Sequence, residues 1–330
     1  MKIKVNETIG SIGEITCLVR HKDGTETEYP VENNTHTYGW FNAITGNNAD
    51  NSGAYYLFNY NNLHVGTGTT PITKTRIGLS AGIAYLSSPS TSNNLYGVTY
   101  GGVEYFGRES TYIFPYGSIS ATIKEVGIGS NPSPATGLHC GKVLTTPVVV
   151  TADDQLVVKY KRLYSGAIAS YRSDGASTWS SKMPEVATGT LVKGVTTHAW
   201  SLRKAVLVDK STPPTMQYLN YVGSVPASTT EVYWSDTTSG AWSYSYYGGV
   251  ASGIVTSPKT NQRDSISYTL KQILPPALGT ITIARVAFFY LGTIGGYETT
   301  AELTFDPPLV KTNEEKLQIT MDVTVTWSQP

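Results

Sequence analysis

The residues with the most familiar chemical spacing are Gly78-Leu79-Ser80-Ala81-Gly82, which match the G-x-S-x-G pattern of serine hydrolases. In those enzymes the serine lies on a sharp turn between a strand and a helix. Ile72 to Ile77 could form the strand, but Ile83 to Leu86 runs directly into Ser87-Ser88-Pro89 and leaves too little room for a helix. No sequence feature connects a histidine to Ser80. We therefore interpret the pattern as a β-turn and expect no catalytic residue.

Two pairs of adjacent acids, Asp153-Asp154 and Glu314-Glu315, are the candidates for acid–base chemistry. Neighbouring residues on a strand point to opposite faces, so neither pair forms a carboxylate dyad by itself. A glycosidase would need two carboxylates that converge on one cleft from separate segments. Nothing in the sequence links other acids to such a cleft, including Glu104, Glu109, Glu125 and Asp264. We expect both pairs to lie in turns and to face water.

Metal-binding and cofactor-binding patterns are absent from the sequence. No two of the five histidines, His21, His36, His64, His139 and His198, have i, i+2 or i, i+4 spacing, and no C-x-x-C motif accompanies His139-Cys140. We expect histidines of loops or of the core, and no metal.

Cys17 and Cys140 are too few for a disulfide framework, so we expect reduced, partly buried thiols, with a pairing between them left open. The glycine-rich segment Gly66 to Pro71 lacks the lysine and the following helix of a phosphate loop. Gly127-Ile128-Gly129 is an isolated G-x-G. Both segments are more typical of tight turns or strand ends, and we expect no cofactor.

Aromatic residues form the most distinctive candidate binding feature. In the segment Trp242-Ser243-Tyr244-Ser245-Tyr246-Tyr247, aromatic and small polar residues alternate before Gly248-Gly249. Aromatic rings beside neutral polar groups can bind sugars, and they also form the centres of protein–protein interfaces. Cross-strand packing within a β-fold is the competing interpretation. Trp242, Tyr244, Tyr246 and Tyr247 are therefore candidate interface or glycan-contact residues.

The composition excludes several classes of function. Lys plus Arg and Asp plus Glu are both 24, so the formal charge is zero, and a nucleic-acid binder usually has a basic excess. Charged residues make up only 15% of the chain, so neutral polar residues must cover the surface, which favours packing against neighbours. No apolar segment reaches the length of a membrane span, and the first ten residues do not resemble a signal peptide. We expect a protein made in a cytoplasm.

The elements that must position these residues are predicted to be strands. Period-two alternation of Thr, Val, Ile and Tyr occurs in Ile15 to Val19, much of Tyr112 to Ile128, Leu156 to Tyr160, Thr280 to Phe289 and Leu317 to Thr326. Turn signals such as Asp23-Gly24 and Asn131-Pro132 separate the alternating segments. Helical periodicity is almost missing. These patterns predict an all-β fold of antiparallel sandwiches, jelly-roll-like, with very little helix.

Four collinear anchors indicate that the fold occurs twice. Pro147 aligns with Pro308 at an offset of 161, and this alignment also matches the two acid pairs. Upstream, Ile123 to Val126 matches Ile283 to Val286, and Thr37 to Trp40 matches Thr197 to Trp200, both at 160. Val65-Gly66 matches Val222-Gly223 at 157. We predict two tandem domains, residues 1–163 and 164–330, in which Trp40 and Trp200 fill equivalent ends of two cores.

Four short motifs follow one another in the first predicted domain. They are Leu63-His-Val-Gly-Thr-Gly-Thr-Thr-Pro71, Ile123-Lys-Glu-Val-Gly-Ile128, Leu144-Thr-Thr-Pro-Val-Val-Val150 and Asp154-Gln-Leu-Val-Val-Lys-Tyr160. In this order they resemble structural proteins of tailed bacteriophages, found in tails, collars and fibre attachments. The likeness departs at Lys142, where the family usually has an arginine. The second domain has Gly223-Ser-Val-Pro226 instead of the G-T-G-T-T-P turn, and Arg285-Val286-Ala287 instead of E-V-G.

The resemblance implies a non-enzymatic virion structural protein that is assembled in the host cytoplasm. Its place would be the tail or the head–tail neck, where it could anchor fibres and contribute to host attachment. Its expected partners are other virion proteins and copies of itself, without nucleic acid or a membrane span. Two alternatives remain open, a capsid decoration protein and a carbohydrate-binding module that recognises a host-surface glycan.

Overall fold

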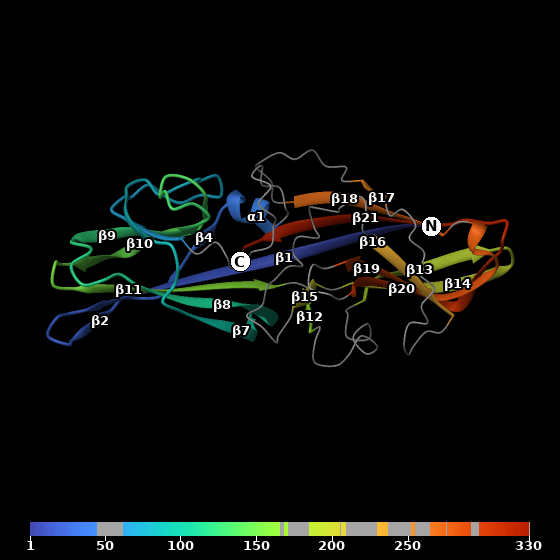
Figure 1. The fold of residues 1–330 in the computed structure, drawn as a ribbon, viewed down its shortest axis with the longest axis horizontal. Helices are drawn as coiled ribbons and strands as arrows, with labels where there is room; N and C mark the ends of the chain where they lie inside the picture. Colours follow the sequence, from blue (N-terminus) through green and yellow to red (C-terminus); the bar gives the residue numbers. More distant parts are fainter. Residues whose placement is uncertain are drawn as a thin grey trace. The chain divides into compact units, whose positions relative to one another are not determined.

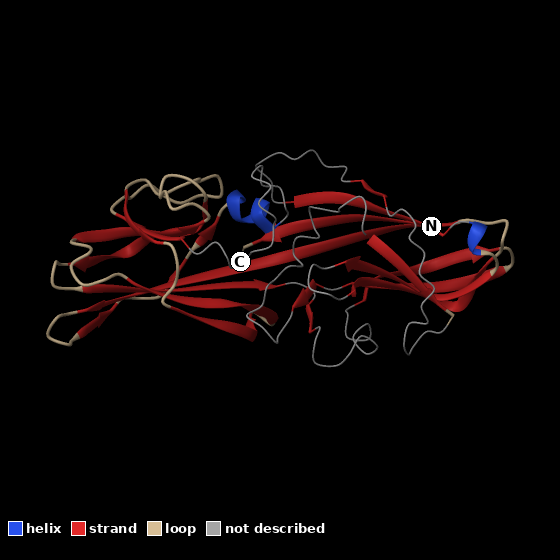
Figure 2. Cartoon of the chain, in the orientation of Figure 1, coloured by secondary structure: helices blue, strands red, loops and turns tan. Residues whose placement is uncertain are grey.

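The computed structural model describes residues 1–44, 62–165, 168–170, 185–204, 206–208, 230–236, 252–254, 265–274, 276–291 and 297–329. Strands dominate this part of the chain (Figure 2). Its helical elements are the short helix α1 (Tyr38–Ile44) and one 3-10 turn, η3 (Pro276–Leu278). The predicted β-rich class with little helix is therefore confirmed. No helix among the described residues has the length and apolar character needed to cross a membrane.

The chain divides into two compact units. In its described part, the N-unit holds residues 9–44, 62–165 and 327–329, and the C-unit holds most of the later residues together with residues 1–8. Two long strands, β1 (Lys2–Arg20) and β21 (Leu317–Ser328), contribute residues to both units. The predicted division into two related domains, residues 1–163 and 164–330, stays a prediction. The two units are defined by the contacts within them, which do not test whether one is a copy of the other.

The N-unit contains antiparallel ladders in two sheets, coloured blue to green in Figure 1. One has the order β1-β11-β8-β7, with β11 (Gln155–Ser165), β8 (Val103–Ile113) and β7 (Thr91–Tyr100). Two short strands, β2 (Glu26–Glu28) and β3 (Glu32–Asn33), also pair with β1. The other has the order β4-β10-β9-β5-β6, with β4 (Thr35–His36), β10 (Leu138–Val150), β9 (Ala121–Gly129), β5 (Asn62–Gly66) and β6 (Gly82–Leu86).

Alternation along these strands builds the core of the N-unit. Ile15, Cys17 and Val19 of β1 are at most 2% exposed, while the residues between them are less buried, as expected for a strand with one face inside. They belong to one apolar cluster with side chains from both sheets, including Val158 of β11 and Val126 of β9. A smaller cluster joins Ile72 and Leu79, from the loop between β5 and β6, to Leu138 of β10, with Val143 packed against it.

The C-unit contains a five-stranded antiparallel sheet of order β13-β14-β20-β19-β16. Its strands are β13 (Glu185–Lys193), β14 (Thr196–Lys204), β20 (Tyr297–Lys311), β19 (Ile281–Leu291) and β16 (Thr230–Ser235). A second ladder has the order β17-β18-β21-β1, with β17 (Ser252–Ile254) and β18 (Ser265–Leu274). Two short strands, β12 (Ile168–Ser170) and β15 (Val206–Val208), pair in parallel.

Candidate functional site

The loop of residues 67–81, between β5 and β6, carries two of the sequence motifs and is the best-built candidate site. Backbone hydrogen bonds fasten it at several points. Leu138 N donates to Ile77 O, Leu79 N donates to Pro134 O, and Tyr38 N of α1 donates to Lys74 O. The segment Ile72 to Ile77, a possible strand by sequence, is part of this loop. Because neighbouring elements hold it along its length, the loop has a defined shape.

Glu125 of β9 is the centre of this arrangement. Its side chain is fully buried, and its carboxylate accepts four hydrogen bonds from the loop. Gly68 N donates to Oε1 at 3.2 Å and Ala81 N donates to Oε1 at 2.7 Å. Ser80 donates to Oε2 through both its backbone N and its Oγ, each at 3.0 Å. A buried carboxylate is tolerable when donors satisfy it, so Glu125 ties both ends of the loop to the sheet.

Gly68 is a glycine because the carboxylate comes so close to the backbone. A Cβ at this position would lie 1.8 Å from Ser80 Oγ and 2.5 Å from Glu125 Oε1. Such distances leave no space for any side chain. The G-T-G-T-T-P turn and the E-V-G strand, which are far apart in the sequence, are therefore parts of one contact.

The same contact defines what Ser80 can do. In a nucleophile elbow, the backbone N–H of the residue after the serine helps to bind the oxyanion. Here Ala81 N and Ser80 Oγ both donate to Glu125, and strand β6 follows instead of a helix. This agrees with the prediction of a structural turn. The geometry lacks the oxyanion donor and the strand–turn–helix context that acyl transfer requires.

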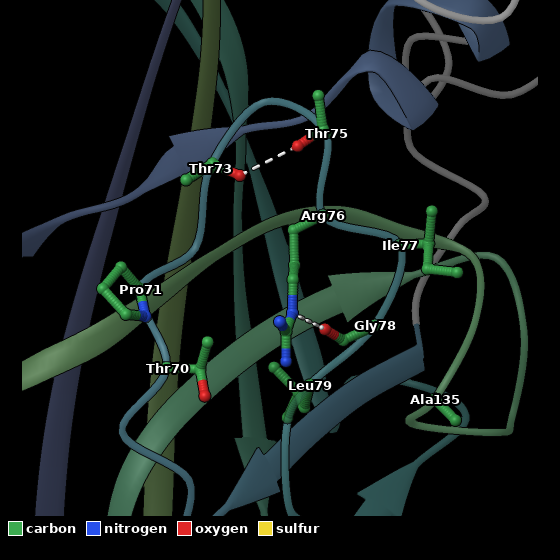
Figure 3. A pocket seen from close by; sticks show the side chains of 9 residues that line it. All are labelled: Thr70, Pro71, Thr73, Thr75, Arg76, Ile77, Gly78, Leu79 and Ala135. Carbon is green, nitrogen blue, oxygen red and sulfur yellow. Dashed lines mark hydrogen bonds between the residues drawn. The ribbon is translucent and has the colours of Figure 1, made fainter.

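A pocket of about 620 Å³ opens on the same loop. Figure 3 shows the side chain of Arg76 extended across it, and Arg76 Nε donates to Gly78 O at 2.8 Å. Thr73 and Thr75 face each other at the rim, with their hydroxyl oxygens 3.1 Å apart. The lining residues are Thr70, Pro71, Thr73, Thr75, Arg76, Ile77, Gly78, Leu79 and Ala135. One guanidinium and three threonine hydroxyls suit a small polar or anionic group, but they contain no acid–base pair.

The acid pairs correct one prediction. Asp153 is exposed, as expected, but Asp154 is only 5% exposed. Its carboxylate accepts hydrogen bonds from Thr151 N at 2.8 Å and Thr151 Oγ1 at 2.7 Å, and it lies 2.6 Å from His21 Nδ1. The hydrogen bonds from Thr151, followed by the contact with His21, lower the pKa of Asp154. The expectation that both acids face water was therefore wrong, because the second acid turns inward and closes the turn.

Glu315 of the second acid pair makes the corresponding contacts. Its Oε2 accepts hydrogen bonds from Lys193 Nζ at 2.6 Å and from Thr312 N at 2.9 Å. The bond from Lys193 is the largest cause of a pKa lowered to about 2. In both turns the second acid bonds the residue three positions earlier and a basic side chain from a distant part of the sequence, His21 in the first turn and Lys193 in the second. These acids are structural caps, since the carboxylate of each accepts hydrogen bonds that close its own turn.

Histidines of the core were expected from the sequence, but their grouping with other buried polar residues in the N-unit was not. Asn34 Nδ2 donates to Tyr160 OH at 2.5 Å, and Tyr160 OH donates to Cys140 Sγ at 3.1 Å. His36 and His139 are buried beside them. Burial, and then the positive charge of Arg162, lower the pKa of each histidine to about 3. Both histidines are therefore neutral at physiological pH.

The structure places the other predicted site residues as follows. His64 Nε2 lies 2.9 Å from Asn131 O, and His198 Nδ1 lies 2.7 Å from Pro307 O, so these histidines have structural partners in loops and strands. Cys17 and Cys140 are free and buried, and burial is the largest cause of pKa values raised to about 12 and about 11. Within the described ranges no three metal-ligating side chains come together.

Two predictions on aromatic residues have different outcomes. Trp242, Tyr244, Tyr246 and Tyr247 lie outside the described residues. Trp40 is buried in helix α1, whereas Trp200 is a partly buried residue of strand β14. The two tryptophans thus occur in unlike elements, and the alignment of Thr37–Trp40 with Thr197–Trp200 gains no support.

Comparisons with known proteins add no identification. No protein-family model matches the chain, and neither the curated proteins nor the solved structures include a significant match.

Proposed function

We propose that this chain is a non-enzymatic structural protein of a tailed bacteriophage particle, built into the tail or the head–tail neck. It would act through contacts with other virion proteins and with copies of itself. The observation that carries the proposal is a set of strand pairings that occurs twice along the chain. It supports a duplicated β-scaffold, with domains near residues 1–163 and 164–330, whose motifs serve the fold instead of catalysis.

The repeated register is clearest in one pair of ladders. In the N-unit, Ile123 of β9 pairs with Val148 of β10, and the next pair is Glu125 with Val143. In the C-unit, Ile283 of β19 pairs with Leu309 of β20, and the next pair is Arg285 with Thr304. The first strand is displaced by 160 residues and the second by 161. Both ladders therefore contain the same four-residue bulge at the same place.

Pro147 and Pro308 lie inside these bulges, where no ladder partner is needed for the missing N–H. The equivalence extends to the neighbouring ladders. Ile113 of β8 pairs with Val157 of β11, and Ile273 of β18 pairs with Gln318 of β21, again at displacements of 160 and 161. A one-residue slip would turn every side chain to the wrong face, so agreement of this kind is strong support for common ancestry.

The turn after each bulged strand is also the same. Asp154 N donates to Thr151 O, and Glu315 N donates to Thr312 O, each pair 161 residues apart. The units differ in what fills the space beside the bulge. The N-unit has the buried Glu125, whereas the C-unit has the buried Arg285, 3.9 Å from Glu302. The C-unit thus lacks the acid that holds the G-T-G-T-T-P loop, in agreement with the absence of that motif from its sequence.

In the N-unit, the single apolar cluster with members from both sheets supports the sandwich form of the scaffold. Two of its edge strands support a role in assembly. From Ile77 to Val103 the sequence contains no charged residue, although charged residues make up 15% of the chain. This stretch holds β6 and β7, which are the last strands of their sheets in the described order. Isolated proteins usually protect such edges with charges.

The test is to purify particles of the phage that encodes this chain and to search them for its peptides by mass spectrometry. We expect the chain at a copy number far below that of the major capsid protein. Its absence from purified particles overturns the proposal. A copy number comparable to the capsid protein would instead indicate capsid decoration.

A further inference from the structure

The pocket on the loop of residues 67–81 contains a positive charge that the described part of the chain does not neutralise. Arg76 Nε donates to Gly78 O at 2.8 Å, and this bond restrains the orientation of the guanidinium. Among the described residues, no acceptor bonds the two terminal NH₂ groups of Arg76. Figure 3 shows this end of the side chain directed toward Thr70 and Leu79 at the pocket wall. The terminal NH₂ groups are therefore available to a ligand.

The sequence around the pocket contains no acid that could pair with Arg76. Among Lys, Arg, Asp and Glu, only Lys74 and Arg76 occur in residues 51–103, and none occurs in residues 126–141, which include Ala135 of the pocket wall. Glu125 borders the second range, but its carboxylate is occupied by the four donors of the loop. Lys74 is directed at Trp327, with Nζ 4.7 Å from the ring centroid. A ligand of this pocket is therefore expected to supply the negative charge.

The groups around the guanidinium favour a carboxylate. The two terminal NH₂ groups of an arginine match the two oxygens of a carboxylate, and one guanidinium balances one negative charge. The hydroxyls of Thr70, Thr73 and Thr75 can donate to the same oxygens. A neutral sugar fits this pocket poorly, because its described lining contains no aromatic ring on which a sugar could stack.

The surface beside the charge is apolar and already ordered. Ile77 is 69% exposed, and Pro71 and Ala135 also line the pocket. An arginine next to apolar groups is typical of the centre of a protein–protein interface. The four hydrogen bonds to Glu125 and the backbone bonds to neighbouring elements hold the loop in shape. Binding therefore requires little further ordering of this surface.

We infer that this pocket, the Arg76 pocket, binds an aspartate or glutamate side chain from an exposed segment of another virion protein. The carboxylate accepts hydrogen bonds from the terminal NH₂ groups of Arg76, and an apolar neighbour in the segment contacts Ile77. The inference rests on the proposed function and names the surface and the chemical character of one expected partner. A sugar acid carries the same group and is the alternative that the experiment separates.

Peptide titration followed by NMR tests the pocket in the full chain. The probe is the pentapeptide acetyl-Gly-Leu-Glu-Gly-Ser-amide, and the matched control peptide has glutamine in place of glutamate. The Nε–H signal of Arg76 and the backbone amide of Ile77 report binding. Arg76→Gln removes the guanidinium, whereas Lys74→Gln removes the other cation of the loop, which does not line the pocket. Thr70→Val is a second pocket variant that leaves the bond from Arg76 to Gly78 in place.

We expect the native chain to bind the glutamate peptide roughly tenfold more tightly than the glutamine peptide, because charge-assisted hydrogen bonds are about twice as strong as neutral ones. Arg76→Gln should abolish this preference, Lys74→Gln should keep it, and Thr70→Val should weaken binding of the glutamate peptide about threefold. The inference is overturned if neither peptide binds, if both bind equally, or if the preference survives Arg76→Gln. Galacturonic acid is the second probe, and tighter binding of this sugar acid than of the glutamate peptide also overturns it.

The titration requires no phage particle, so the two proposals fail separately. Preference for the glutamate peptide in a chain that is absent from purified particles would refute the proposed function, and with it the virion partner, while the carboxylate site would stand. A chain that particles contain but that shows no such preference would refute the Arg76 pocket alone.

Discussion

At the scale of single residues, Glu125 shows how a charged group can organise a fold. Its carboxylate has four acceptor sites and receives four donors, so the cost of burying the charge is offset. The donors come from the two ends of one loop. Glu125 therefore determines the position of the pocket-lining segment, although it does not line the pocket itself.

Replacing Glu125 with glutamine should destabilise the N-unit strongly. The amide keeps one acceptor oxygen and introduces an NH₂ group that faces backbone donors. We expect a loss of roughly 2–4 kcal/mol in the free energy of unfolding, because buried donors are left unsatisfied. Ser80→Ala removes only one of the four bonds and should cost about 1 kcal/mol. Urea denaturation of both variants measures the difference, and equal effects would contradict the central role of Glu125.

The buried histidines predict how stability depends on pH. His36 and His139 have a pKa of about 3 in the folded chain, against 6.5 as the ordinary value. Between these values the unfolded chain binds more protons, so the stability that these two histidines contribute rises with pH up to about 6.5 and is then constant. Each histidine should contribute a slope of about 1.4 kcal/mol per pH unit below 6.5.

Urea midpoints between pH 5 and 8 test this dependence. In this window carboxylates with a lowered pKa, such as Asp154, remain charged in both states. His36→Gln should reduce the slope of stability against pH between pH 5 and 6.5 by about 1.4 kcal/mol per pH unit, which corresponds to one proton. A slope that His36→Gln leaves unchanged would show that His36 is already protonated in the folded protein.

At the scale of elements, the turns after β10 and β20 should be interchangeable. Replacing Ala152-Asp153-Asp154 by Asn-Glu-Glu gives the first turn the sequence of the second. Because Glu315 bonds Thr312 as Asp154 bonds Thr151, we expect the replaced turn to keep its hydrogen bonds and the thermal midpoint to stay close to that of the native chain. The control variant Asp154→Ala removes the hydrogen bonds from Thr151 and should lower the thermal midpoint. Circular dichroism melting curves compare the three chains.

At the scale of the whole molecule, segments distant in sequence complete each unit. Trp327 belongs to the N-unit, where it is 4% exposed and stacks on Phe41 with ring centroids 5.9 Å apart. Its Nε1 donates to Ser11 Oγ at 2.8 Å, and Gln329 Nε2 donates to Asn34 O at 2.5 Å. Trp327 is therefore part of the core of the N-unit, whose other buried residues lie between residues 9 and 165.

Trp327→Ala should consequently destabilise the N-unit by about 3–5 kcal/mol, the usual cost of truncating a buried tryptophan. Hydrogen exchange followed by mass spectrometry should show faster exchange in peptides of residues 9–44 and 62–165. Ser328→Ala, at an exposed neighbouring position, serves as the control. Protection that changes only in residues 297–326 would contradict the assignment of Trp327 to the N-unit.

Part of the candidate site was accessible from the sequence. The absence of a helix after Ser80 follows from the local sequence, and the free cysteines agree with the expectation drawn from their small number. The contact of Glu125 with Gly68 and Ser80 could not be predicted from the sequence. The bulge in β10 opposite Ile123 to Glu125 interrupts the alternation of β9, so Ile123 and Val126 both join the core and Glu125 lies on the other face. A charged residue within an otherwise apolar strand was the available signal. The burial of Asp154 was missed for a related reason, since its partner His21 is 133 residues away.

The β-rich class and the similar turns after β10 and β20 were determined by the sequence itself, because strand alternation and turn chemistry depend on neighbouring residues. Pairings between distant segments were decided only by the tertiary structure. Residues 1–8 pair in parallel with β21, and Trp327 stacks on Phe41. Both pairings depend on which apolar faces remain to be covered once the local strands have formed. Local patterns carry no information about that choice, since many strands of this chain offer similar faces.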